Sequence, residues 1–178
     1  MSKSSKKGAK AVRLQYGALP YRFVASGELQ LLLVTSRERR RWIMPKGWPI
    51  KGLTPPKSAA SEAFEEAGVR GRIGSKPIGR YRYAKVLADE SGTIPCEVLM
   101  FELRVERQLE DWPEAREREK SWVSPQEAAW LIEEEGLRSI LEAFVGRLSF
   151  AAPAAGPKGR RNQRSSRLEG AGVIQGGL

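Results

Sequence analysis

The stretch that most restricts how this chain can fold is GWPIKGLTPPKSAASEAFEEAGV, residues 47–69. Its first part is rich in Gly and Pro, which is typical of a loop. Thr54 can cap a helix whose first position is Pro55, because proline is tolerated where no backbone N–H is needed. Gly68 supplies a stop signal. We therefore predict a loop followed by a helix over about Pro56 to Ala67.

Three glutamates fall on one face of this predicted helix. Glu62, Glu65 and Glu66 have the i, i+3, i+4 spacing that brings side chains together. One interpretation is a solvated acidic face, which is common on exposed helices. The other is a site for a divalent cation, because Mg²⁺ prefers carboxylate oxygens together with waters and substrate phosphates.

The whole stretch resembles the Nudix box, which favours the second interpretation. That pattern is Gly, five residues, Glu, seven residues, Arg-Glu, an apolar residue, any residue, Glu-Glu, any residue, Gly and an apolar residue. Two of its nine fixed positions differ here, where Leu53 replaces Glu and Ser61 replaces Arg. The seven that match are Gly47, Glu62, Ala63, Glu65, Glu66, Gly68 and Val69.

The resemblance extends on both sides of the box, over about Arg13 to Phe144. The flanking segments LLLVTSRERRRWIMPKG and LEDWPEAREREKSWVSPQEA look like the branch that contains diphosphoinositol polyphosphate and diadenosine polyphosphate phosphohydrolases. This implies a metal-dependent pyrophosphohydrolase that cleaves a phosphoanhydride bond in a highly phosphorylated small molecule.

The resemblance also implies roles for individual residues. Glu62 and Glu66 are the expected catalytic residues and leading ligands of Mg²⁺ or Mn²⁺, with Glu65 as a supporting ligand and the Gly47 carbonyl completing the site. Glu62 is the residue expected to orient or deprotonate the attacking water. Bound metal ions lower the pKa of water and neutralise charge on phosphoryl oxygens, which suits in-line displacement.

The two departures from the box affect residues that support the site rather than its ligands. Losing one member of an ion pair would leave an unpaired charge, but losing both removes the charges together. We therefore interpret Leu53 and Ser61 as a coupled replacement, with Leu53 packing in place of the acid. The alternative is a catalytically impaired Nudix module that binds phosphorylated ligands or nucleic acid.

Cations are expected to surround the metal site and to bind the substrate phosphates. Arginine does this through its two-pronged guanidinium and lysine as a point charge. Any one of them can equally be an ordinary surface cation, but as a group they favour a highly phosphorylated substrate, such as an inositol pyrophosphate, a dinucleoside polyphosphate or inorganic polyphosphate. The predicted substrate-binding residues are Arg37, Arg41, Lys46, Lys51, Arg82, Lys85, Arg118 and Lys120.

Composition narrows the remaining possibilities. The chain of 178 residues has no histidine, which excludes His-based acid–base catalysis, His-containing triads and His-ligated zinc. Its single cysteine, Cys96, favours a reducing, cytoplasmic compartment and is expected to be buried. No apolar segment is long enough to span a membrane. The oligomeric state cannot be deduced from these features.

The net charge of +10 is concentrated at the two ends of the chain. Residues 1–13 carry five cations and no acid, and residues 151–178 carry five cations and one acid, which leaves only +1 in between. We predict disordered basic segments at 1–12 and 151–178 around a single domain, 13–150. Such segments bind polyanions non-specifically, which makes nucleic-acid binding a second functional hypothesis.

The remaining patterns indicate an α/β fold with a mixed sheet and helices on its faces, and the resemblance specifies a Nudix-like α/β/α sandwich. Two strands are expected around Ser26-Gly27, and two more over 69–88 and 93–106 with a turn near residues 90–92. A capping box at Ser124 opens a helix expected to end at Gly136, before a last helix over about 137–148. The expected packing residues are Trp112, Trp122 and Trp130, whereas Trp42 and Trp48 either line the site or stack on a base.

Overall fold

A computed structural model describes residues 11–87 and 92–151. Within these ranges the chain forms eight strands and three helices. They are β1 (Arg13–Phe23), β2 (Leu29–Thr35), β3 (Trp42–Ile43), β4 (Lys46–Gly47), α1 (Pro55–Ala67), β5 (Val69–Ile73), β6 (Gly79–Val86), β7 (Thr93–Gln108), β8 (Lys120–Val123), α2 (Pro125–Leu131) and α3 (Glu135–Ala151).

The strands form one mixed sheet in the order β3-β2-β1-β7-β5. The central pair, β1 and β7, is parallel, and the other pairs are antiparallel. Three strands lie off this path, since β4 pairs with β1, β6 with β7 and β8 with β2. The mixed sheet predicted from the sequence is therefore confirmed.

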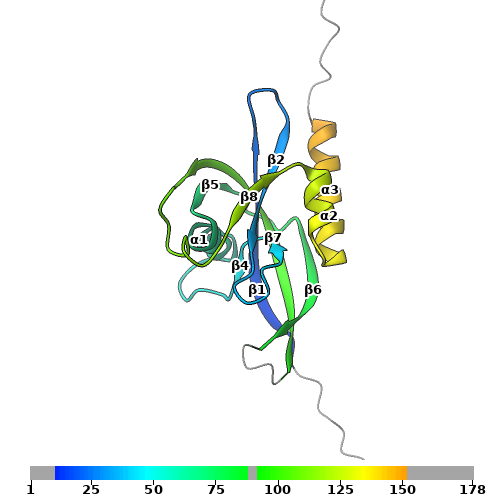
Figure 1. The fold of residues 1–178 in the computed structure, drawn as a ribbon. Helices are drawn as coiled ribbons and strands as arrows, with labels where there is room; N and C mark the ends of the chain where they lie inside the picture. Colours follow the sequence, from blue (N-terminus) through cyan, green and yellow to red (C-terminus); the bar gives the residue numbers. More distant parts are fainter. Residues whose placement is uncertain (1–10, 88–91, 152–178) are drawn as a thin grey trace, which may run out of the picture.

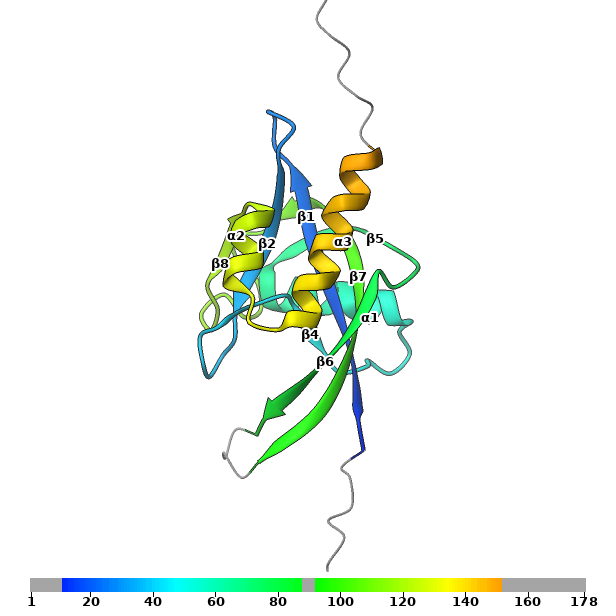
Figure 2. The ribbon, with the colours of Figure 1, turned by 90° about the vertical axis from the view of Figure 1, so that its right-hand side faces the viewer.

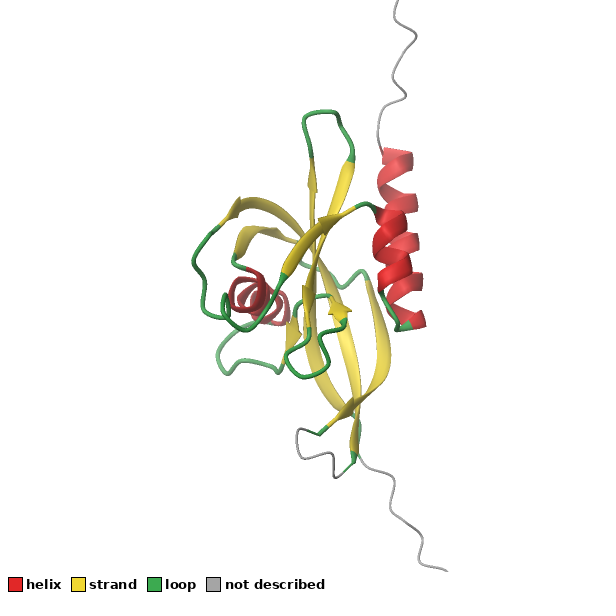
Figure 3. Ribbon diagram, in the orientation of Figure 1, coloured by secondary structure: helices red, strands yellow, loops and turns green. Residues whose placement is uncertain are grey.

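Helices cover both faces of the sheet (Figures 1 and 3). Helix α1 lies on one face, and α2 and α3 lie together on the other, as the view turned by 90° also shows (Figure 2). The apolar run in β2 follows from this arrangement. Leu31 and Leu33 pack toward α2 and α3, whereas Leu32 and Val34 pack toward α1, because successive side chains of a strand point to opposite faces.

Helix α1 follows the predicted signals and begins one residue earlier than expected. Thr54 is its N-cap in an extended conformation, although its side chain makes no capping hydrogen bond. Gly68 ends the helix in the left-handed conformation at φ 66°, where a residue without a Cβ is favoured. Ala59, Ala63 and Ala67 are fully buried against the sheet, so the glutamate face points sideways along it.

The prediction that the helix opened by Ser124 ends at Gly136 is wrong. The Ser124 side chain does cap α2, accepting from the Glu127 N–H, but α2 ends at Leu131. Gly136 instead lies in the first turn of α3. A Cβ there would approach the Tyr81 Cβ to 2.7 Å, so the glycine allows α3 to pack closely on β6 rather than stopping a helix.

For the burial of single residues, the structure confirms one further prediction from the sequence and contradicts two. Cys96 is buried as predicted, whereas Trp130 is 83% exposed and contributes nothing to the core. Leu53 was expected to pack and is instead exposed in the turn before α1. Most of the predicted turn at 90–92 and nearly all of both basic segments lie outside the described residues. No helix among the described residues is long and apolar enough to cross a membrane.

Candidate active site

A cleft of about 310 Å³ opens where α1, β4 and the segment after β2 come together. All three glutamates of α1 line it, and so does Gly47 from β4. Cations from the segment after β2, from β4 and from β6 form the remaining walls, together with residues that precede β8. The topology produces this meeting, because β1 pairs with β4 through Tyr16 and Gly47 while α1 packs across β1.

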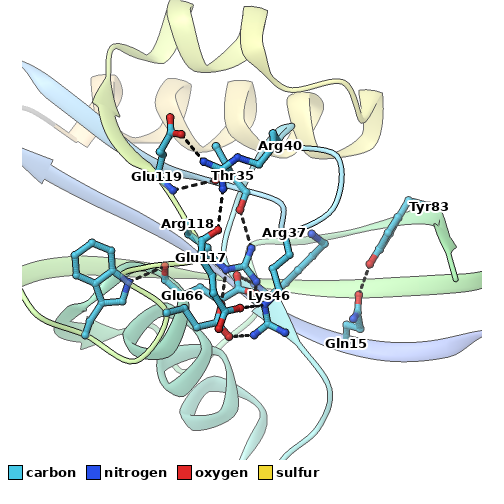
Figure 4. A network of polar contacts seen from close by, with 12 residues as sticks. Gln15, Thr35, Arg37, Arg40, Lys46, Glu66, Tyr83, Glu117, Arg118 and Glu119 are labelled. Atoms are coloured by element: carbon cyan, nitrogen blue, oxygen red, sulfur yellow. Dashed lines mark hydrogen bonds and ion pairs between the residues drawn. The ribbon is translucent and has the colours of Figure 1, made fainter. Parts of the chain in front are cut away.

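Glu66 is the most buried carboxylate of the cleft, with 8% of its side chain exposed. Its Oε2 accepts a hydrogen bond of 3.1 Å from the Lys46 backbone N–H, and its Oε1 forms an ion pair with Arg118 (Figure 4). Burial raises the pKa of Glu66, and Arg118 and Lys46 oppose that rise by stabilising the ionised form. Glu66 is thus fixed at both oxygens.

Glu62 lies directly against Gly47. A Cβ added at Gly47 would fall 2.1 Å from both the Cδ and the Oε1 of Glu62, so the glycine provides the space that the carboxylate occupies. Burial, followed by the charges of Glu66 and Glu65, raises the pKa of Glu62 to about 7. Glu65 completes the row, and its Oε1 accepts a 2.9 Å hydrogen bond from Ser61. Ser61, which stands where the Nudix box has arginine, therefore forms a hydrogen bond with Glu65, a predicted metal ligand.

The donor set fits a divalent cation. Three carboxylates from successive turns of one helix, beside the backbone of a glycine, offer the hard oxygen ligands that Mg²⁺ and Mn²⁺ prefer. Among the described residues no three acidic side chains already converge on a point, and Glu66 is paired with Arg118. Burial is the main cause of the raised pKa of Glu62, and the charges of Glu66 and Glu65 add to it; a cation beside these carboxylates would oppose both effects by stabilising the ionised form.

The raised pKa of Glu62 predicts how metal-free stability depends on pH. The folded protein binds more protons than the unfolded chain between the ordinary value of 4.5 and about 7, so the unfolding free energy falls as pH rises through this window. We expect the decline, measured by urea denaturation in a chelator between pH 4.5 and 8, to be shallower in Glu62→Gln. Equal slopes in the two proteins would contradict the assignment.

The structure brings five of the eight predicted substrate-binding residues into the cleft: Arg37, Arg41, Lys46, Lys85 and Arg118. The other three lie elsewhere. Lys51 is exposed in the turn before α1, and Arg82 points outward from β6 and pairs with Glu97 at 2.9 Å. Lys120 extends beneath the C-terminal end of α1.

Three of the six cations that line the cleft, Arg37, Arg41 and Arg118, are already paired with acids. The Arg37 Nε lies 2.8 Å from Glu117, and its Nη2 contacts Glu114 (Figure 4). Arg41 binds Glu133 at 2.8 Å. Lys46 differs, because its ammonium group is deeply buried, which lowers its pKa, and lies 5.3 Å from the centre of the Tyr83 ring. The Lys85 ammonium group similarly lies 5.1 Å from the Trp48 ring.

Besides Glu38, sequence reasoning missed two largely buried acidic residues of the cleft. Glu114 and Glu134 both line it, with only 12% of each side chain exposed. Glu114 comes from the segment after β7 and joins Arg37 to Arg118, and Glu134 lies between α2 and α3. Neither belongs to a local pattern, since each reaches the cleft only through the fold.

The position of Lys120 predicts a structural role instead of substrate binding. Its ammonium group donates to the carbonyls of Ala67 at 3.1 Å and Leu109 at 3.0 Å, and lies 3.5 Å from the Trp112 ring. We expect Lys120→Met to lower the unfolding free energy by about 1–3 kcal/mol, because two carbonyls lose their donor. The turnover of folded Lys120→Met protein, freed of aggregates, should stay within severalfold of wild type. A stable Lys120→Met protein with strongly reduced turnover would indicate that Lys120 binds the substrate.

Carboxylates on one wall of a cleft and cations on the other are what enzymes acting on phosphoric anhydrides require. No family model matches the sequence, but individual proteins do. Nudix hydrolase 12, mitochondrial, from Arabidopsis thaliana is 33% identical over 147 residues, which are 75% of this chain and 72% of that protein. The chain therefore belongs to the Nudix hydrolase family, whose enzymes hydrolyse anhydrides of phosphorus-containing compounds.

Two further similarities concern the predicted branch and the fold. Diphosphoinositol polyphosphate phosphohydrolase 3-beta from Bos taurus is 29% identical over 105 residues, covering 58% of this chain and 59% of that protein. A binary complex of a C. elegans Ap4A hydrolase has a TM-score of 0.59 at 20% identity, covering 78% of this chain and 99% of that one. The second similarity confirms the α/β/α fold.

Proposed function

We propose that this protein is a divalent-metal-dependent pyrophosphohydrolase of highly phosphorylated small molecules. The observation that carries the proposal is the position of Glu62, Glu65 and Glu66 beside Gly47, in the same cleft as Lys46 and Lys85. Glu62, Glu66 and the Gly47 carbonyl would hold Mg²⁺ or Mn²⁺, with Glu65 in support. The ions supply Lewis acidity and lower the pKa of bound water.

The residues of the chain bind and orient the reactants. Lys46 and Lys85 face the cleft beside aromatic rings rather than in ion pairs with acids, so they are placed to receive phosphate oxygens. The Glu62 carboxylate lines the same cleft as these cations, where it would take a proton from the attacking water. The names of the bovine and nematode relatives support inositol pyrophosphates and dinucleoside polyphosphates as the substrates to examine first.

A substrate screen tests this function. Diadenosine tetraphosphate, an inositol pyrophosphate, a nucleoside triphosphate and inorganic polyphosphate would be incubated with Mg²⁺, Mn²⁺ or a chelator in ¹⁸O-labelled water. We expect release of an ¹⁸O-labelled phosphate product from at least one of them, and no release in the chelator. Tight binding of these compounds without any product would favour the impaired binding module instead.

The nucleic-acid hypothesis depends on the basic segments, and no observation of the described residues favours it. A protein lacking residues 1–10 and 152–178 separates the two functions. Hydrolysis should survive this deletion because every residue of the cleft is retained, whereas polyanion binding carried by the ends should disappear.

A further inference from the structure

Arg118 is the most completely bonded cation of the cleft. Each nitrogen of its guanidinium group has a partner: Nε contacts Glu114, Nη1 donates to the Thr35 carbonyl at 2.8 Å, and Nη2 contacts Glu66 (Figure 4). Only 6% of the Arg118 side chain is exposed, so the ion pair with Glu66 is shielded from water. Glu66 is also a proposed metal ligand, and the two roles compete for one carboxylate.

Two of these three bonds hold Arg118 in place whatever happens to Glu66. The Thr35 carbonyl belongs to the backbone of β2, and Glu114 is itself fixed by Arg37. The third bond alone joins Arg118 to α1. The Nη2 group can therefore exchange its partner while the rest of the guanidinium group stays anchored.

The charges of the cleft favour such an exchange. Its lining contains six cations and six carboxylates, so its formal charges balance in the absence of metal. A guanidinium group and a divalent cation repel each other strongly if they share one buried carboxylate. Once a cation occupies Glu66, Nη2 needs another acceptor, and a phosphate oxygen in the cleft matches its geometry.

Resting on the function proposed above, we propose that Arg118 is a positioning residue that exchanges its partner. It holds Glu66 in the metal-free protein and binds a substrate phosphate after the carboxylate has taken up its cation. The metal site is thereby coupled to the substrate site through one side chain. Metal binds first, and the protein favours the anionic substrate only afterwards.

Metal binding without substrate tests this competition directly. The probe is Mn²⁺, titrated into the full chain and followed by calorimetry and electron paramagnetic resonance. We expect Arg118→Met to bind Mn²⁺ about tenfold more tightly than wild type, in the usual range for coupled sites. Arg41→Met is the matched control, because Arg41 lines the same cleft but pairs with Glu133 and Glu134 instead of Glu66 or Glu114. It should change the affinity much less.

A second variant and a spectroscopic measurement guard against misfolding. Arg118→Lys keeps the positive charge but loses the branched guanidinium group. It should bind Mn²⁺ with an affinity between those of wild type and Arg118→Met. In wild type, side-chain ¹⁵N resonances of Arg118 should move on titration with Mg²⁺, while those of Arg82, which is paired with Glu97, stay fixed. Unmoved Arg118 resonances, or equal Mn²⁺ affinities in Arg118→Met and Arg41→Met, would overturn the exchange. Failure of wild type to bind Mn²⁺ at all would overturn the proposed function itself.

Discussion

Replacing Glu62 with glutamine is expected to lower phosphoanhydride hydrolysis by about two to four orders of magnitude, the usual contribution of a catalytic acid or base. The same change should leave the metal-free protein as stable as wild type, or more stable. Burial and the neighbouring carboxylates already disfavour the charge of Glu62, and a neutral amide of the same shape removes that repulsion. Initial rates at saturating Mg²⁺ and urea denaturation in a chelator measure the two effects.

Glu66→Gln provides the matched comparison. It also removes a proposed ligand, but it takes away the buried partner of Arg118. Breaking a buried ion pair costs about 3–5 kcal/mol, and the contact between Arg118 and Glu114 moderates this loss. Glu66→Gln should therefore lose both activity and stability. A Glu62→Gln protein with turnover within tenfold of wild type would remove Glu62 from the catalytic machinery.

Gly47→Ala is expected to reduce turnover by about a hundredfold, because displacement of a catalytic group by about 1 Å is enough for a loss of this size. The added Cβ would occupy the position of the Glu62 carboxylate, 2.1 Å from its Oε1. That carboxylate is the end of a flexible side chain, so it can move away at little cost in stability. The expected result is a folded protein with weakened Mn²⁺ affinity and low turnover.

Gly146→Ala serves as the control for this substitution. Gly146 lies within α3, and a Cβ there meets no atom within 4 Å. Alanine should stabilise that helix by up to about 1 kcal/mol and leave turnover unchanged. Full activity in Gly47→Ala, with Mn²⁺ affinity equal to wild type, would show that Glu62 need not lie beside Gly47.

The helix of the site was predictable because its signals are local. Pro55 and Gly68 mark its ends, and the 3.6-residue period places the three glutamates on one face. The same local reasoning failed at Gly136, whose role depends on Tyr81, a residue of a distant strand. Strand β4 has only two residues, too few for a periodic pattern, and it lies beside the segment that the sequence indicated as a loop.

The cations of the site show a different limit. Their number was visible in the sequence, but their partners were not, since Arg37 and Glu114 are separated by 77 residues. The strand period of two places Arg80 and Arg82 on one face of β6, where both approach Glu97. It could not show that this face lies outside the cleft. Counting cations therefore overestimated the positive charge available to a substrate.

The parallel pairing of β1 with β7 has a consequence for synthesis on the ribosome. β1 is the central strand, and its main partner begins only at Thr93, about eighty residues later. Contacts of such long sequence separation form slowly, because a large loop must close first. While the first ninety residues emerge, the apolar residues of β1 and β2 lack the neighbours that β7, α2 and α3 supply. Chaperones that bind nascent chains should therefore bind this chain before residue 108 has left the ribosomal exit tunnel.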